Sequence, residues 1–167
     1  MNTKRSESMP IATAEVQWAV ELSGDESADI DEDSFSLWVN TAVSTVAPTR
    51  SGLVTIRVVD EPESSRFNEG YRDKAGPTNV LAFPAEPLPE FVDEADTELG
   101  DLVICLPVVR REANEQEKTL QAHLTHMTVH GTLHLLGYDH ISQTEAEEME
   151  ALEVQALANL GVANPYD

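Results

Sequence analysis

The segment HGTLHLLGYDH, residues 130–140, contains three histidines in a pattern that predicts a helix followed by a sharp turn. Residues four apart lie one above the other on a helix, so His130 and His134 can hold one ion together. The next turn of the same helix rises about 5.4 Å, whereas zinc holds each imidazole nitrogen at roughly 2.0–2.1 Å. A third ligand therefore requires a bend. Gly137 supplies the bend, because glycine readily ends helices in the left-handed conformation, and His140 follows as the third ligand.

Three protein ligands leave a fourth tetrahedral position for water or substrate, which is typical of catalytic rather than structural zinc. We therefore expect one zinc ion at the C-terminal end of a buried helix. His126 and His123 extend the row of histidines toward the start of that helix. His126 and His134 lie roughly 11–12 Å apart along the axis, too far to share an ion. We expect His126 to lie behind the ligands, face the substrate or pack between helices, and His123 to be solvated or packed.

The same histidine spacing occurs in the metzincin proteases, whose motif is H-E-x-x-H-x-x-G-x-x-H. Gly131 stands here at the position of the glutamate. In those enzymes the glutamate is the general base for the attacking water, and glycine has no side chain for that role. A peptidase function is weakened by this difference but stays open.

The length of 167 residues predicts a single domain, which we assign to residues 13–165, preceded by a disordered N-terminus at residues 1–12. The one cysteine, Cys105, permits no intramolecular disulfide and is expected in a buried strand. No stretch is apolar and long enough to span a membrane, and no apolar signal core follows the first basic residues. We expect a cytoplasmic protein that has no membrane partner.

The formal charge of −21 argues against broad, nonspecific adhesion to nucleic acid. Apart from Lys4 and Arg5, every basic residue lies between Arg50 and Lys118. A polyanion would therefore have to bind a local basic cluster together with the metal. The candidates are Arg57, Arg66, Arg72, Lys74, Arg110 and Arg111.

Hydrophobic periodicity and capping residues predict an α/β (α+β) fold, in which about five helices pack on a single mixed four-stranded sheet. An acidic loop, residues 23–33, is expected to be solvated. A second acidic loop, residues 85–98, is expected to be a solvated linker, with shielding of a sheet edge or closure over a site as the alternative. The glutamates of the last helix are expected on its exposed face. The expected strands are 14–22, 53–60, 79–83 and 99–106. The expected helices follow a cap at Asp33 or Ser34 (to Ala47), follow Pro62 (to about Asn68), begin at Pro107, and follow caps at Thr119 and Ser142.

Three motifs in this order, TNVLAFP, LGDLVIC and HGTLHLLGYDH, resemble the YbeY family of bacterial rRNA-maturation endoribonucleases. The likeness extends from about Val54 to the run EAEEMEALE of the last helix, some two thirds of the chain. The resemblance implies metal-dependent cleavage of single-stranded RNA rather than DNA. It further implies a role in 16S rRNA 3′ end maturation and in ribosome quality control. The implied partners are rRNA, the ribosome and a ribosomal protein or GTPase.

The same resemblance assigns the zinc ligands to His130, His134 and His140 and a functionally important arginine to Arg72 in GYRDKAGPTNVLAFP. We take Arg72 and His130 as the catalytic residues. A planar guanidinium suits the charge on a scissile phosphodiester. Asp139 could orient a ligand, relay a proton or hold the turn in place.

Two alternatives stay open from the sequence. The first is a metal-dependent hydrolase of another substrate, including peptides, which would need a base that Gly131 cannot supply. The second is a ribosome-assembly binding module with a structural metal, which would need no open coordination position.

Overall fold

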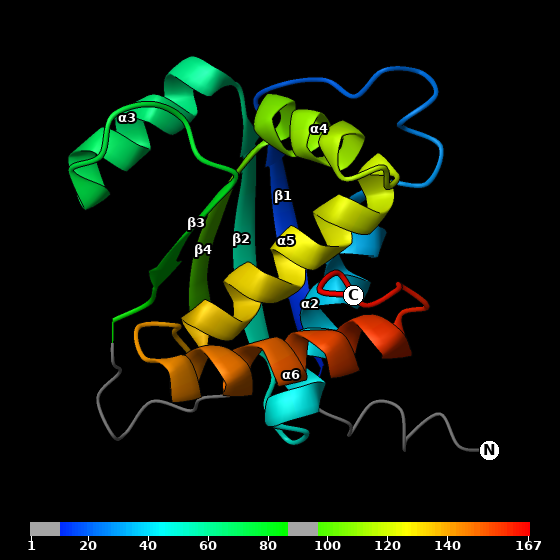
Figure 1. Cartoon of the computed structure of the whole chain (residues 1–167), viewed down its shortest axis with the longest axis vertical. Helices are drawn as coiled ribbons and strands as arrows, with labels where there is room; N and C mark the ends of the chain where they lie inside the picture. Colours follow the sequence, from blue (N-terminus) through cyan, green and yellow to red (C-terminus); the bar gives the residue numbers. More distant parts are fainter. Residues whose placement is uncertain (1–10, 87–96) are drawn as a thin grey trace.

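The protein is described by a computed structural model, in which residues 11–86 and 97–167 are placed. Within these ranges the protein has one mixed four-stranded sheet and five helices, the last of which packs mainly against two other helices, so the predicted α+β fold is confirmed (Figure 1). No helix of the described ranges is long and apolar enough to cross a membrane. The elements are β1 (Ala12–Trp18), α2 (Glu32–Val46), β2 (Gly52–Val59), α3 (Glu61–Arg72), β3 (Val80–Pro84), β4 (Glu98–Cys105), α4 (Leu106–Glu115), α5 (Leu120–Leu135) and α6 (Gln143–Asn159).

The strands lie in the order β1-β2-β4-β3. β1 and β4 each pair with β2 in parallel, and β3 pairs with β4 in antiparallel fashion. β3 is therefore an edge strand of the sheet, and it packs against α5 (Figure 1).

The alternation of side chains along β2 and β4 produces two cores. Ile56 and Leu102 point toward the larger core, which β1, α2 and α5 complete. Val103 and Cys105 point to the opposite face, where Phe67 of α3 and residues of α4 cover them. The sheet is thus covered on both faces, as expected for central parallel strands that are apolar along their length. Cys105 is fully buried in a strand, as predicted.

Helix α5 is enclosed on two sides. Leu124 and Met127 join the core against the sheet, whereas Val129 and Leu133 pack against Met149 of α6. Helices that are apolar around most of their circumference are buried. The histidine-bearing helix is accordingly buried, as predicted, and it lies between the sheet and α6 (Figure 1).

The helix after β2 is longer than predicted. We expected it to end near Asn68, but α3 continues to Arg72 through Gly70. Pro62 lies in its first turn, where its missing N–H removes no hydrogen bond. Asp73 ends the helix in the left-handed conformation, with φ of 54°. The extension places Arg72 on a helix end instead of in a loop.

The predicted start of α2 was also wrong. Asp31 caps this helix, because its side chain accepts a hydrogen bond from the Ser34 backbone N–H at 2.9 Å. β1 ends at Trp18, four residues before the predicted end at Leu22. The predicted caps Thr119 of α5 and Ser142 of α6 are confirmed, the latter within a complete capping box. The other boundaries agree within about two residues, the usual uncertainty of helix and strand ends.

The predicted solvated loop at residues 23–33 is tied to the rest of the fold. Glu26 accepts two hydrogen bonds from Arg110 of α4, at 2.7 and 2.8 Å. Most of the second acidic loop, residues 87–96, lies outside the described residues, as do residues 1–10 of the predicted disordered N-terminus.

Candidate metal centre

The turn that follows α5 has the geometry that the sequence predicts. Gly137 adopts φ of 102°, a left-handed conformation that glycine alone takes without steric cost. Its N–H donates to the His134 carbonyl at 3.0 Å, and the Tyr138 N–H donates to the Leu133 carbonyl at 3.1 Å. These two bonds form a Schellman motif, which closes the helix and redirects the chain. His140 is thereby returned to the end of the helix that carries the other two histidines.

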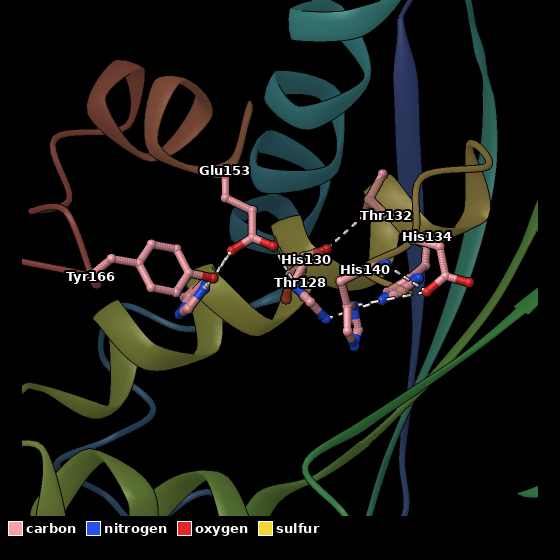
Figure 2. A network of polar contacts seen from close by, with 9 residues as sticks. Thr128, His130, Thr132, His134, His140, Glu153 and Tyr166 are labelled. Carbon is pink, nitrogen blue, oxygen red and sulfur yellow. Dashed lines mark hydrogen bonds and ion pairs between the residues drawn. The ribbon is translucent and has the colours of Figure 1, made fainter. Parts of the chain in front are cut away.

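One ring nitrogen from each of His130, His134 and His140 lies within 4.8 Å of the others, so the three could hold a metal ion (Figure 2). The Nε2 atoms of His130 and His134 are 3.1 Å apart. Two ligands of a tetrahedral zinc ion are separated by roughly 3.3 Å, given the usual zinc to nitrogen bond length. The spacing of His130 and His134 therefore fits a zinc ion with little movement.

The surroundings of His134 favour the uncharged imidazole that metals require. Burial lowers the pKa of His134, and the neighbouring His130 and His140 lower it further. His130 and His134 are half-buried, whereas His140 is exposed. The site is therefore open to a substrate from the His140 side.

Glu153 of α6 lies directly behind His130. Its Oε2 is 2.5 Å from Nδ1 of His130 and its Oε1 is 2.8 Å from Nε2 of His126 (Figure 2). The Tyr166 hydroxyl donates to the same carboxylate at 2.5 Å. Glu153 itself is completely buried. One buried carboxylate thus joins α5, α6 and the C-terminal segment.

The charge state of Glu153 fixes the tautomer of His130. Burial acts to raise the pKa of Glu153, but hydrogen bonds from His126, His130 and Tyr166 prevail and lower it to about 2. The carboxylate is therefore ionised and can only accept, so Nδ1 of His130 carries the hydrogen. In the neutral imidazole, Nε2 then keeps its lone pair, which faces the other two histidines. This carboxylate–histidine arrangement is the usual support of a metal-ligating imidazole.

The expected exposure of all glutamates in α6 was wrong for Glu153. It lies four residues after Met149 and three before Ala156, inside the apolar stripe of the helix. A charged residue within such a stripe, facing a helix with several histidines, was the signal that could have identified it. His126 is buried and serves as a second donor to Glu153, in line with its expected place behind the ligands.

His123 is buried as well, and its Nε2 lies 2.8 Å from Oε1 of Glu112 on α4. It therefore belongs to the packing between α4 and α5, one of the two roles expected for it. Asp139 accepts a hydrogen bond from the backbone N–H of His140 at 2.7 Å, while its nearest contact to the ring nitrogen is 3.8 Å. Of the three roles considered for Asp139, this geometry favours holding the turn in place.

A cleft of about 720 Å³ opens in front of the histidines. Its walls are formed by β3, by the turn at Gly137–His140 and by the end of α3. Arg72 and Tyr71 of α3 line the same cleft as His130 and His134. Within the described residues Arg72 forms no ion pair, so its guanidinium is available to an anion.

Gly131 lies where α5 approaches the sheet most closely. A Cβ atom at this position would be 2.8 Å from Cδ2 of Leu102 and 3.3 Å from Cγ2 of Val80. Distances this short force the neighbouring atoms to move, and Leu102 is completely buried. A glutamate at this position, as in the metzincins, would not fit without displacing the helix from the sheet.

A family model described as Endoribonuclease YbeY matches residues 22–161 of the sequence. The chain belongs to the YbeY endoribonuclease family. The match covers α2 to α6 and includes the three histidines, Arg72 and Glu153. The family suggested by the sequence motifs is therefore confirmed.

Several YbeY relatives are highly similar to this chain. Proteins named Endoribonuclease YbeY from strains of Coxiella burnetii are 50% identical over 131 residues, covering 78% of this chain and 84% of theirs. The Endoribonuclease YbeY of Alcanivorax borkumensis is 48% identical over 160 residues, covering 95% of this chain and 88% of its own.

The fold is shared with a solved structure of low sequence identity. A Thermotoga maritima protein solved in solution superposes with a TM-score of 0.50 at 23% identity, covering 92% of this chain and 96% of its own. This likeness supports the α+β fold of the YbeY chain independently of the motifs.

Proposed function

We propose that this chain is a zinc-dependent endoribonuclease that cuts single-stranded RNA. The observation that supports it best is the convergence of His130, His134 and His140 in a cleft that Arg72 also lines. The names of the relatives support an RNA substrate. We take His130, His134 and His140 as the ligands of one zinc ion, and Arg72 and His130 as the catalytic residues.

The donor set fits zinc, because three neutral imidazoles with one open position are the ligands of known catalytic zinc sites. When bound, zinc supplies a Lewis acid that activates water and polarises a phosphoryl oxygen. Glu153 would hold the Nδ1 hydrogen of His130 throughout, and so keep Nε2 available as a ligand. Arg72 would bind two oxygens of the scissile phosphodiester through parallel N–H donors and stabilise the charge that develops there.

We place this activity in the cytoplasm, in 16S rRNA 3′ end maturation and ribosome quality control. The net charge of −21 makes unaided binding to rRNA weak, so a ribosomal protein or GTPase partner is proposed to deliver the enzyme. The tight approach of Gly131 to Leu102 disfavours a peptidase, since the helix position that would carry the base accepts no side chain.

The test compares the wild type with His134→Ala and Arg72→Ala, measuring zinc content and cleavage of a single-stranded rRNA fragment. We expect about one zinc per chain in the wild type and in Arg72→Ala, and little in His134→Ala. Cleavage should fall by at least about 100-fold in both variants, as when a transition-state donor is removed. Arg111→Ala removes an exposed arginine that is paired with Glu61 at 3.6 Å, and it should leave both quantities unchanged.

Two results would contradict the proposal. Cleavage by a zinc-free His134→Ala variant at the wild-type rate would refute the metal mechanism. Stoichiometric zinc without cleavage of RNA or of intact ribosomes would favour the binding module or a different substrate.

A further inference from the structure

A second hollow of about 470 Å³ lies beside the metal cleft. It is lined by Arg57, Glu63, Arg66, Phe67 and Tyr71, so all but one of its residues come from α3. Tyr71 also lines the metal cleft. The side chain of Tyr71 therefore forms the boundary between the two hollows.

Tyr71 presents an aromatic ring to solvent in a fixed position. The residue is 71% exposed, the highest value among the aromatic residues described. Its ring centroid is 4.6 Å from that of Phe83 and 6.5 Å from that of Phe67, which stacks on it at 22°. Phe67 and Phe83 pack in turn against the core between the sheet and α4. The ring is thus supported by the fold on one side and free on the other.

The charges around the second hollow leave one arginine unneutralised. Arg57 forms an ion pair with Glu63 and a hydrogen bond with Gln17, so its charge is compensated. Arg66 is exposed and has no ion pair within the described residues. The chain has a net charge of −21, yet an unpaired guanidinium group lines each of the two hollows beside Tyr71. Arg72 lines the metal cleft, and Arg66 lines the second hollow.

We propose that Tyr71 and Arg66 form a nucleotide-binding subsite next to the scissile bond. One base of a single-stranded RNA stacks on the free face of Tyr71, and the adjoining phosphate binds Arg66. An aromatic platform combined with a cationic track is the usual device for single-stranded nucleic acids. This inference rests on the proposed function, in which Arg72 and the histidines hold the phosphodiester that is cut.

The subsite would also explain a preference for single strands. A base within a duplex is stacked on its neighbours and paired, so it cannot lie on Tyr71 unless it is unstacked first. The metal cleft alone, which recognises a phosphodiester, offers no such discrimination.

The test measures binding of short single-stranded RNAs that carry 2-aminopurine at successive positions to the full-length chain in excess EDTA. Binding and the quenching of 2-aminopurine on stacking are read together, at low salt. We expect Tyr71→Ala to weaken binding by about 5- to 100-fold and to abolish quenching at one position. Tyr71→Phe should retain both effects. Arg66→Ala should weaken binding without abolishing the quenching. Arg111→Ala should leave both unchanged, because Arg111 is paired with Glu61 and lines neither hollow, although the sequence placed it in the basic cluster.

Because EDTA prevents metal-dependent turnover, the binding measurement tests the subsite independently of the proposed cleavage activity. Wild-type binding with position-specific quenching, but without cleavage when zinc is added, would contradict the proposed function and support the subsite. Normal cleavage with equal binding and quenching in Tyr71→Ala would overturn the subsite and leave the function intact. Absence of any RNA binding by the wild type would overturn the subsite as well. Equal affinity for an acidic peptide of the same charge would also overturn it, since a general anion site needs no base platform.

Discussion

Glu153 determines how His130 can face a metal ion. Its carboxylate accepts hydrogen bonds from Nδ1 of His130 and from Nε2 of His126, so the lone pair of His130 points toward His134 and His140. Burial and the adjacent carboxylate of Glu153 raise the pKa of Tyr166, which keeps its hydroxyl protonated as a third donor. Replacing the carboxylate with a neutral amide would leave His126, His130 and Tyr166 with a weaker hydrogen-bond acceptor.

We expect Glu153→Gln to lower zinc affinity by about 10- to 100-fold, the usual effect of losing a carboxylate that supports a ligand histidine. The measurement is a competition titration with a chromophoric zinc chelator. Glu148→Gln changes an exposed glutamate of the same helix and serves as the control. Equal zinc affinity in both variants would show that Glu153 only fills space between α5 and α6.

The three histidines could be assigned to the site from the sequence, whereas Glu153 could not. The histidines and Gly137 are linked by helix geometry within one short segment, so spacing alone brings them together. The contact of Glu153 with His130 depends on how α6 packs across α5, which no local spacing determines. The position of Glu153 falls within the periodic apolar stripe of α6. Because the residue is charged, we expected it on the exposed face of the helix, and this was wrong.

At the level of elements, the approach of α5 to β4 depends on Gly131. We expect Gly131→Ala to lower the free energy of unfolding by about 1 kcal/mol. Overpacking against Leu102 costs about 1–3 kcal/mol, and the higher helix propensity of alanine returns about 1 kcal/mol. Gly70→Ala is the control, because α3 leaves open space at that position and the change should stabilise the protein. Denaturant unfolding of the two variants checks this, and equal stabilisation of both would contradict the packing argument.

The segment before α2 is tied to α4 by the paired contact of Glu26 with Arg110. The hydrogen bond from Arg110 is the main cause that lowers the pKa of Glu26 from 4.5 to about 2. A depressed carboxyl pKa stabilises the fold above the unfolded-state pKa, and this contribution is lost as the pH falls through the folded-state value.

We therefore expect Glu26→Gln to abolish a part of the pH dependence of stability between about pH 4.5 and pH 2. The difference in unfolding free energy between wild type and variant should shrink steadily as the pH falls through this window. Asp25→Asn, an exposed neighbour without an ion pair in the described residues, is the control. A difference that stays constant down to pH 2 would contradict the assigned pair.

Elements were predictable to the extent that their signals are local. Thr119 and Ser142 are caps that accept hydrogen bonds from residues three positions later, and both predictions hold. The partners of Glu26 and of the strands lie far away in the chain, and neither composition nor periodicity specifies them. The order β1-β2-β4-β3 and the pairing of Glu26 could therefore not be predicted.

On the scale of the whole molecule, the basic residues of the predicted cluster fall into two groups, those that form an ion pair within the placed ranges and those that form none there. Arg57, Arg110 and Arg111 of the predicted basic cluster are paired with glutamates. Arg66, Arg72 and Lys74, on α3 and just after it, form no ion pair within the described residues. Arg72 lines the histidine cleft and Arg66 the neighbouring hollow, so a strongly acidic chain presents unpaired guanidinium groups on this side, which favours a polyanionic substrate there.

The central claim is that one zinc ion held by His130, His134 and His140 is required to cut single-stranded RNA. It is tested most directly by removing all metal from the full-length protein and measuring cleavage of a single-stranded rRNA fragment while zinc is added back. We predict no cleavage without metal, a rise in proportion to added zinc, and a plateau at about one equivalent, as expected for a single site of three imidazole ligands. Full cleavage by the metal-free protein, or none at any zinc concentration, would contradict the claim.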